Sequence, residues 1–199
     1  SPCLKNGYVT FGSFNHFRKV TDSMLAAWKK ILDAVPNSRL ILKSNIFNNT
    51  TMKEFTTKRL EDLGFELERF ELRGFSNTHP LDYNEIDIAL DTYPYTGVTT
   101  TCEALYMGVP VISLYGEKLS SRLGLSILNN VGLYDLEVDS YDKYIDKAVT
   151  LAGNWEELKA FRKNLLPMMK KSPLMDSTNY VHEVEEAFIK ILANEKLNS

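Results

Sequence analysis

Hydroxyl side chains gather near the middle of the chain, where a glycine-containing loop leads into a predicted helix. Residues 91–101 read Asp-Thr-Tyr-Pro-Tyr-Thr-Gly-Val-Thr-Thr-Thr, so Gly97 comes just before Thr99 and Thr100. Glycine lets backbone approach a ligand closely, and free N–H groups at a helix start suit an anion. The pattern therefore indicates a diphosphate site. Glu103, one turn later, could accept hydrogen bonds from a ribose diol.

The same residues also have a purely structural interpretation. Thr99 could simply cap the helix, as Thr often does. Glu103 could be a solvated acid that interacts favourably with the helix dipole in the first turn. The residue types alone do not choose between a ligand site and a helix cap.

The loop after the first predicted strand carries cationic and polar groups. Residues 13–19 read Ser-Phe-Asn-His-Phe-Arg-Lys. Lys19 could neutralise phosphate as a mobile point charge, and His16 could hydrogen-bond a phosphate or a sugar. The alternative is an ordinary solvated lysine on the surface.

Two further loops follow predicted strands. Residues 74–80, which include Ser76 and His79, form a natural place for a nucleotide base to rest, although His79 could instead cap a helix that begins near Pro80. Residues 116–122 could supply another cap or a sugar contact, and Arg122 could equally pair with a surface acid.

Several familiar sites are missing from the sequence. There is no G-x-G-x-x-G after the first strand and no G-x-x-x-x-G-K-[ST], which argues against a dehydrogenase and against a P-loop NTPase. No Ser, His and Asp set has nucleophile-elbow spacing. Two cysteines and three histidines without ligand spacing favour a protein with no structural metal and no disulfide scaffold.

These loops must be positioned by alternating strands and helices. Strands are expected at residues 8–14, 39–43, 69–74, 86–90, 109–114 and 133–138, and helices at residues 21–35, 51–63, 99–107 and 118–130. Such alternation implies a parallel sheet with helices on both faces. We therefore predict an α/β, doubly wound, Rossmann-like fold, in which ligands bind beyond the carboxyl ends of the strands.

The last sixty residues have a purely helical pattern. Apolar stripes run through residues 140–152, 154–171 and 177–193, and Pro167 is expected to kink or break the second helix. We expect residues 1–139 to form a Rossmann-like, ligand-binding domain and residues 140–199 to form helices that pack on it. These helices could cover the sheet edge or cross to a missing domain.

The composition favours a globular protein and argues against one that binds nucleic acid. A length of 199 residues with 44% hydrophobic residues suits one well-buried core, and a formal charge of −3 provides no basic field for nucleic acid. No apolar run approaches the roughly 18 residues that cross a bilayer, so we expect a soluble domain. The small number of cysteines favours a reduced, cytoplasmic protein. The chain starts at Ser1 rather than Met, which suggests a fragment or a processed product.

The ordered series of these segments resembles the C-terminal catalytic lobe of the O-linked N-acetylglucosamine transferase and SPINDLY family. The resemblance runs through Phe-Asn at 14–15, Val-Pro-Asn-Ser at 35–38, Leu-Asp-Thr at 90–92, Gly-Val-Thr-Thr at 97–100, Gly-Val-Pro-Val at 108–111, Gly-Glu at 116–117, Ser-Arg at 121–122 and Ser-Pro-Leu at 172–174. Such proteins are GT-B glycosyltransferases, with two Rossmann-like lobes that face a cleft. The resemblance implies that this chain is the C-terminal half, which binds a nucleotide sugar, and that an N-terminal lobe and a protein acceptor are its partners.

The resemblance also implies roles for individual residues. Lys19 matches the lysine that neutralises the donor diphosphate and is the candidate catalytic residue, while Thr99 and Thr100 match the pair that meets the diphosphate. His16 stands at a glutamine position that reaches the donor, His79 matches a histidine near the base, and Glu103 stands at an aspartate position that meets the ribose.

Three departures from the animal enzymes concern the donor. Val98 replaces a histidine, Ser76 replaces a base-contacting lysine, and Asp82 replaces an arginine. We expect an inverting, metal-independent transfer of N-acetylglucosamine from UDP-GlcNAc, a co-substrate rather than a cofactor, to Ser or Thr of a protein. The alternatives are a relative that uses GDP-fucose, a fragment that binds nucleotide sugar without turnover, a sugar-nucleotide epimerase lobe and an interaction domain without a ligand.

Overall fold

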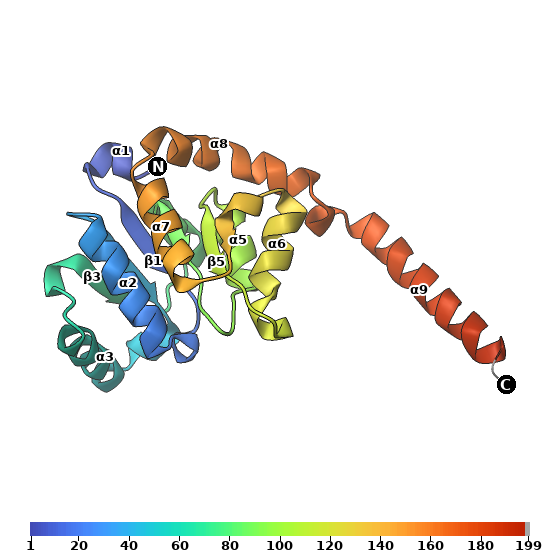
Figure 1. Cartoon of the computed structure of the whole chain (residues 1–199), viewed down its shortest axis with the longest axis horizontal. Helices are drawn as coiled ribbons and strands as arrows, with labels where there is room; N and C mark the ends of the chain where they lie inside the picture. Colours follow the sequence, from blue (N-terminus) through green and yellow to red (C-terminus); the bar gives the residue numbers. More distant parts are fainter. Residues whose placement is uncertain (198–199) are drawn as a thin grey trace.

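The computed structural model describes residues 1–197 and contains a six-stranded parallel sheet (Figure 1). Its strands are β1 (Thr10–Ser13), β2 (Arg39–Lys43), β3 (Phe70–Arg73), β4 (Ile88–Leu90), β5 (Val111–Leu114) and β6 (Glu137–Val138). Their order in the sheet is β3-β2-β1-β4-β5-β6, and every pair is parallel. This is the strand order of a doubly wound Rossmann-like fold, so the predicted fold class is confirmed.

The strands form because short apolar segments are buried inside the sheet. Phe11 of β1 and Leu40 of β2 are fully buried and are paired in register, and Ile88 of β4 pairs with Phe11 from the other side. Residues 40–42 of β2 and 88–90 of β4 are continuous in apolar residues, as is usual for parallel strands that are covered on both faces. The central strands are therefore held by the core, and their carboxyl ends have fixed positions.

The helices follow the expected alternation. Their bounds are α1 (Cys3–Asn6), α2 (Asp22–Ala34), α3 (Thr50–Asp62), α4 (His79–Asp82), α5 (Thr99–Tyr106), α6 (Leu123–Val131), α7 (Tyr141–Ala152), α8 (Trp155–Lys171) and α9 (Ser177–Leu197). The predicted helix 118–130 begins differently. Its first residues form a short 3-10 turn, Leu119–Ser121, in which Ser121 and Arg122 donate to carbonyls three residues earlier.

Helix α2 links the sheet to the C-terminal part of the chain. Thr21 caps it, as the sequence predicts, by accepting a hydrogen bond from the Met24 N–H at 3.3 Å. Trp28 is fully buried and donates through Nε1 to the hydroxyl of Tyr144 in α7 at 3.2 Å. Helices α2 and α7 therefore pack side by side against the sheet (Figure 1).

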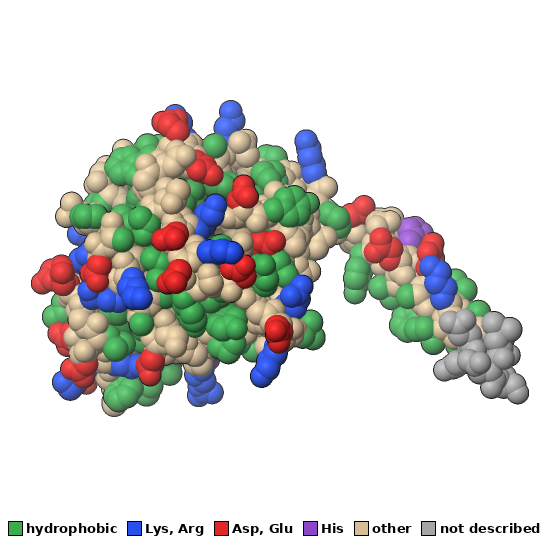
Figure 2. Space-filling view, in the orientation of Figure 1, with side chains coloured by type: hydrophobic (Ala, Val, Ile, Leu, Met, Phe, Trp, Pro, Cys, Tyr) green, Lys and Arg blue, Asp and Glu red, His purple; other side chains and the backbone are tan. Residues whose placement is uncertain are grey.

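The last two helices behave differently from each other. Helix α8 runs without a break through Pro167 and contacts α5, α6 and α7. Helix α9 extends away from the body of the molecule, and its apolar side chains, such as Tyr180 and Phe188, are exposed (Figures 1 and 2). This differs from our expectation that all the C-terminal helices pack on the domain. The division of the chain near residue 139 stays a prediction.

Candidate functional site

The candidate site lies where the strand order reverses. Strand β1 is paired with β2 on one side and β4 on the other, so the loops that follow β1 and β4 leave the sheet in neighbouring positions. Ligands of open α/β sheets bind in the crevice at this point. The predicted residues Lys19 and Thr99 belong to these two loops and to the helix that follows the second.

A buried carboxylate, Asp91, organises the space below this crevice. It follows β4 directly, is only 2% exposed, and accepts hydrogen bonds at Oδ1 from the N–H groups of Thr92 at 2.8 Å and Gly97 at 2.7 Å. Its Oδ2 accepts from the Ser113 hydroxyl at 2.7 Å. Burial raises the pKa of Asp91, against these hydrogen bonds and the nearby charge of Lys19. Asp91 thus ties together the ends of β4 and β5 and the loop before α5.

Asn15 connects Asp91 to Lys19. The Asn15 amide donates through Nδ2 to Asp91 Oδ1 at 3.2 Å, so its oxygen points the opposite way. That oxygen accepts from Lys19 Nζ at 3.3 Å and from the Thr100 hydroxyl at 3.0 Å. A carboxylate only accepts hydrogen bonds, and this fixes the orientation of the amide. The result is a short chain of contacts from the buried acid to the predicted phosphate residues.

The ammonium group of Lys19 is held rather than free. Besides Asn15, its Nζ donates to the carbonyl oxygen of Thr96 at 3.2 Å and lies 4.4 Å from the centroid of the Tyr95 ring. Partial burial lowers the pKa of Lys19, while the charge of Asp91 acts in the opposite direction. Lys19 therefore presents a positioned cation beside the start of α5.

The start of α5 is not capped by a threonine. The residue before the helix is Val98, which makes no side-chain cap, and Thr99 is the first helical residue, with an exposed side chain. The interpretation of Thr99 as an N-cap is therefore wrong, because its backbone is already helical. The first N–H groups of a helix have no partner inside the helix, so this end offers donors to an anion.

The turn before α5 has no room for a side chain at Gly97. A Cβ atom at this position would lie 2.6 Å from the hydroxyl oxygens of both Thr100 and Thr101. Its N–H is used by Asp91. Gly97 thus allows the loop to fold tightly under the helix start, and its contact with a ligand stays a prediction.

A second polar cluster contains His79, Glu103 and Tyr83. His79 Nε2 lies 3.1 Å from Glu103 Oε2, and the buried Tyr83 hydroxyl lies 3.2 Å from the same oxygen. The Tyr83 hydroxyl is also 3.2 Å from the carbonyl oxygen of Thr100. Burial raises the pKa of Tyr83, and the charge of Glu103 raises it further. Helix α5 joins the two clusters, because it carries both Thr100 and Glu103.

Lys43, the last residue of β2, stands behind His79. Its Nζ lies 2.8 Å from His79 Nδ1 and 3.2 Å from Ser76 Oγ, and it forms an ion pair with Asp82. Ser76 also donates to Asp82 Oδ2 at 2.8 Å. Burial alone would raise the pKa of Asp82, but the hydrogen bonds from Lys43 and Ser76 outweigh it, and the pKa is lowered.

An open groove of about 270 Å³ adjoins this second cluster. Phe14, His16, Lys43, Phe75 and His79 are among the residues that line it. His16 is exposed, and its Nδ1 accepts a hydrogen bond from the Arg18 N–H at 3.3 Å. His79 does not cap α4, since it is the first residue of that helix and Thr78 precedes it.

The structure brings most of the predicted residues into two adjoining clusters. Lys19, Gly97, Thr99 and Thr100 lie at the start of α5, and Ser76, His79 and Glu103 lie beside the groove, which His16 also lines. Sequence reasoning assigned no site role to three residues that hold these clusters: Lys43, Asp91 and Tyr83. A position directly at the end of a buried strand was a usable signal for Lys43 and Asp91.

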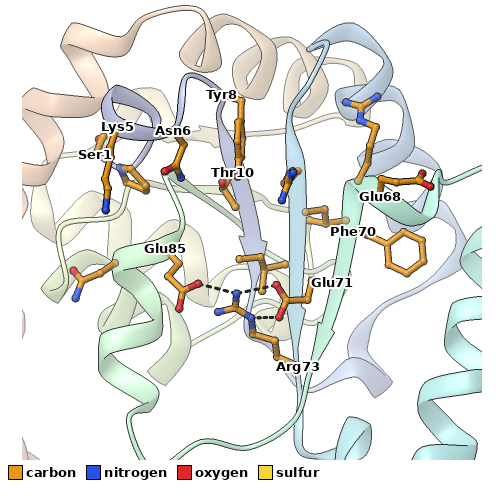
Figure 3. Close-up of a pocket in the computed structure, with 16 residues that line it drawn as sticks. Ser1, Lys5, Asn6, Tyr8, Thr10, Glu68, Phe70, Glu71, Arg73 and Glu85 are labelled. Atoms are coloured by element: carbon orange, nitrogen blue, oxygen red, sulfur yellow. Dashed lines mark hydrogen bonds and ion pairs between the residues drawn. The ribbon is translucent and has the colours of Figure 1, made fainter.

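A larger cavity, of about 650 Å³, contains none of the predicted residues. It lies over β1, β2 and β3 and is lined by Tyr8, Thr10, Phe70 and neighbouring side chains (Figure 3). Arg73 is held there between Glu71 and Glu85, at 2.5 and 2.7 Å. Two acidic side chains thus neutralise Arg73 in this cavity.

Two kinds of feature are absent from residues 1–197. No group of three or more His, Cys, Asp or Glu side chains converges there as it would around a metal ion. None of the helices in that range is both long enough and apolar enough to span a bilayer.

Relatives of known sequence match nearly the whole chain. It is 40% identical over 191 residues to a tomato (Solanum lycopersicum) protein described as probable UDP-N-acetylglucosamine–peptide N-acetylglucosaminyltransferase SPINDLY, covering 94% of this chain and 20% of that protein. The Arabidopsis thaliana protein SEC, described as a probable enzyme of the same activity, is 29% identical over 185 residues, which are 91% of this chain and 18% of SEC. The chain therefore spans about a fifth of the length of these relatives.

Solved structures show the same fold. The K341M mutant of the Thermobaculum terrenum O-GlcNAc transferase superposes with a TM-score of 0.85 at 34% identity, over 92% of this chain and 36% of that one. The Anabaena protein HepE, in a complex with UDP and glucose, matches with a TM-score of 0.66 at 12% identity, over 93% of this chain and 51% of HepE. The fold is thus that of a lobe of GT-B glycosyltransferases.

The family model for glycosyl transferase family 41 matches residues 3–184. That range includes β1 to β6 and every residue of the two clusters described above. The chain belongs to glycosyl transferase family 41.

Proposed function

We propose that this chain is the donor-binding lobe of a glycosyltransferase that moves N-acetylglucosamine from UDP-GlcNAc to Ser or Thr hydroxyls of a protein. The observation that carries the proposal is the meeting of Lys19, Thr100 and the start of α5 at the point where the strand order reverses. The names of the relatives supply the donor and the acceptor class. HepE, which shares the fold, has been solved with UDP.

The donor would lie across both clusters. Its diphosphate would meet Lys19 and the N–H groups at the start of α5, and its ribose would meet Glu103. The base would enter the groove beside His79, where Phe75 offers an exposed ring. Base–aromatic stacking does not depend strongly on which base is bound, so this arrangement supports a nucleotide more directly than it supports uracil.

The sugar transfer requires that negative charge on the leaving group be stabilised. The acceptor hydroxyl attacks the anomeric carbon from the face opposite the diphosphate, its proton passes to solvent, and the bond from that carbon to the β-phosphate oxygen breaks. The electron pair leaves with the nucleoside diphosphate, which inverts the anomeric configuration. Lys19 and the helix N-terminus are placed to stabilise that negative charge without a metal ion.

A second lobe and a protein acceptor are parts of the same proposal. A GT-B site needs two lobes that face each other, and this chain covers 20% of its plant relatives. We therefore infer that the chain by itself binds nucleotide without turnover. A cytoplasmic location also belongs to the proposal, supported by the free thiols of Cys3 and Cys102.

Two experiments test this function. Calorimetry of the 199-residue chain with UDP, GDP, UDP-GlcNAc and GDP-fucose measures which donor class binds, and tight binding of only the guanine compounds would select the GDP-fucose alternative. A product assay with a protein acceptor, on a longer protein that contains the second lobe, measures transfer. Release of free epimerised sugar without an acceptor would select the epimerase alternative, and no binding of any nucleotide would refute the proposed function.

A further inference from the structure

Lys43 is a buried cation for which the proposed transfer has no direct use. Its side chain is only 4% exposed, and its Nζ lies 5.7 Å from the centroid of the Phe14 ring. Burying an ammonium group is costly unless it is paired and hydrogen-bonded. Its contacts must therefore offset this cost, and they also restrict what Lys43 can do.

All the donors of Lys43 are in use. An ammonium group has three N–H donors and no acceptor. Here the three face Ser76 Oγ at 3.2 Å, His79 Nδ1 at 2.8 Å and a carboxylate oxygen of Asp82. No donor is left for a bound base, so Lys43 acts through its neighbours.

The contact with His79 selects one form of the ring. Because Lys43 can only donate, the Nδ1 of His79 must accept and carries no proton. In the neutral ring the proton is then on Nε2, which lies 3.1 Å from Glu103 Oε2 and donates to it. The contact of Nδ1 with Lys43 thus determines that Nε2 carries the proton.

This arrangement sets the orientation of Glu103. Its Oε2 is occupied by His79 Nε2 and the Tyr83 hydroxyl, both from the segment before β4. The other carboxylate oxygen can then accept hydrogen bonds from a ligand. A line of contacts therefore runs from Asp82 through Lys43 and His79 to Glu103.

We propose that Lys43 is a positioning residue of the nucleoside end of the donor site, which holds His79 in the Nε2–H form and thereby orients the Glu103 carboxylate toward the sugar diol of a nucleotide. The part that concerns the nucleotide rests on the proposed function. The part that concerns His79 belongs to the ligand-free protein and is independent of it.

The first experiment determines the tautomer of His79 in the ligand-free 199-residue chain. Nitrogen-15 NMR of labelled histidine at pH 8.5 distinguishes the two ring nitrogens, and a His79→Gln variant identifies the signals among those of the three histidines. We expect wild-type His79 to be protonated on Nε2, with Nδ1 accepting a hydrogen bond. A ring protonated on Nδ1 would overturn the proposal, and this measurement needs no Lys43 variant that folds.

Two substitutions then separate positioning from simple pairing of charges. Lys43→Met keeps an unbranched apolar side chain but removes the three donors, so the Nδ1 signal should move toward that of a nitrogen without a hydrogen bond. Asp82→Asn removes a charge but keeps an acceptor for Lys43, so the His79 signals should stay as in the wild type. If both variants shift the His79 nitrogen signals equally, the ion pair between Lys43 and Asp82, rather than the contact of Lys43 with His79, determines the state of the ring. That result would overturn the proposal.

Calorimetry with UDP and GDP tests the consequence for the ligand. Loss of a hydrogen bond that involves a charged group should weaken binding of whichever nucleotide the wild type prefers by about tenfold or more in Lys43→Met. Asp82→Asn should change it by less than about threefold. Unchanged affinity in a folded Lys43→Met protein would refute the role toward the donor. If the wild type binds neither nucleotide, the proposed function fails, and the NMR result still decides the assignment of His79.

Discussion

Replacement of Asp91 by alanine should destabilise the domain more than any change of an exposed acid. Asp91 is almost completely buried and accepts hydrogen bonds from Asn15, Thr92, Gly97 and Ser113. In Asp91→Ala these four donors lose their acceptor in a space from which water is excluded.

The magnitude follows from what the alanine leaves behind. A buried donor without an acceptor costs about 1–3 kcal/mol. The costs of the four donors are not additive. The alanine also removes the cost of burying a charge, which the raised pKa of Asp91 reflects. We therefore expect a loss of about 3–5 kcal/mol in the free energy of unfolding, as for other broken buried networks. Asp91→Asn keeps one acceptor oxygen and should cost about 1–2 kcal/mol.

Urea denaturation followed by circular dichroism measures these differences through the midpoint at an unchanged m value. Asp62→Ala is the control, because Asp62 is exposed and its pair with Lys58 lies on the surface. That control should change the free energy of unfolding by less than about 0.5 kcal/mol. A loss below about 1 kcal/mol in Asp91→Ala, or a larger loss in Asp91→Asn, would show that this hydrogen-bond network does not hold the site as we infer.

Three further predictions concern the site itself. Lys19→Met in the longer protein should lower turnover by about 100-fold or more, because it removes the charge that we propose stabilises the leaving group. Since burial lowers the pKa of Lys19, donor affinity should also decline at a lower pH than it would with an exposed lysine; calorimetry between pH 7 and pH 10 tests this, and an unchanged affinity would contradict it. The pKa of Asp82 is lowered from 3.8 in the folded protein, so the ionised carboxylate contributes fully to stability above pH 3.8 and loses this contribution as the pH falls through the folded-state pKa. The difference in unfolding free energy between wild type and Asp82→Asn should therefore shrink between pH 5 and pH 2, and a constant difference would refute this. Gly97→Ala should cost about 1–3 kcal/mol through overpacking and should lower the melting temperature, whereas Gly153→Ala, with no atom closer than 3.4 Å to the added carbon, should melt close to the wild type.

Much of the fold could be predicted because it depends on local patterns. Short apolar segments that alternate with helical periodicity indicate β/α units, and parallel strands joined by such units place all their carboxyl ends at one edge. The order of the elements along the chain therefore suffices to place the loops of Lys19 and Thr99 at the same edge of the sheet. The chemistry of these residue types, a cation and a helix start, indicates an anion site.

Other features depended on atoms that are distant in sequence. The break expected at Pro167 is absent, since α8 continues through it while packed against α5 and α7, and packing outweighs the lost hydrogen bond. Similarly, nothing in the local sequence indicates whether Thr99 begins the helix or precedes it, because cap and first turn differ only in backbone angles.

The sequence by itself determined the α/β fold, and it predicted the edge of the sheet that carries the candidate site and the candidate residues for a diphosphate. Only the tertiary structure decided how those residues are held. Asp91 meets Asn15 across 76 positions of the chain, and Lys43 meets His79 and Asp82 across 36 and 39. Such pairs are brought together by strand order and register, which are set by burial of the whole core rather than by any neighbouring residue, so the buried charges that support the site became visible only in the folded protein.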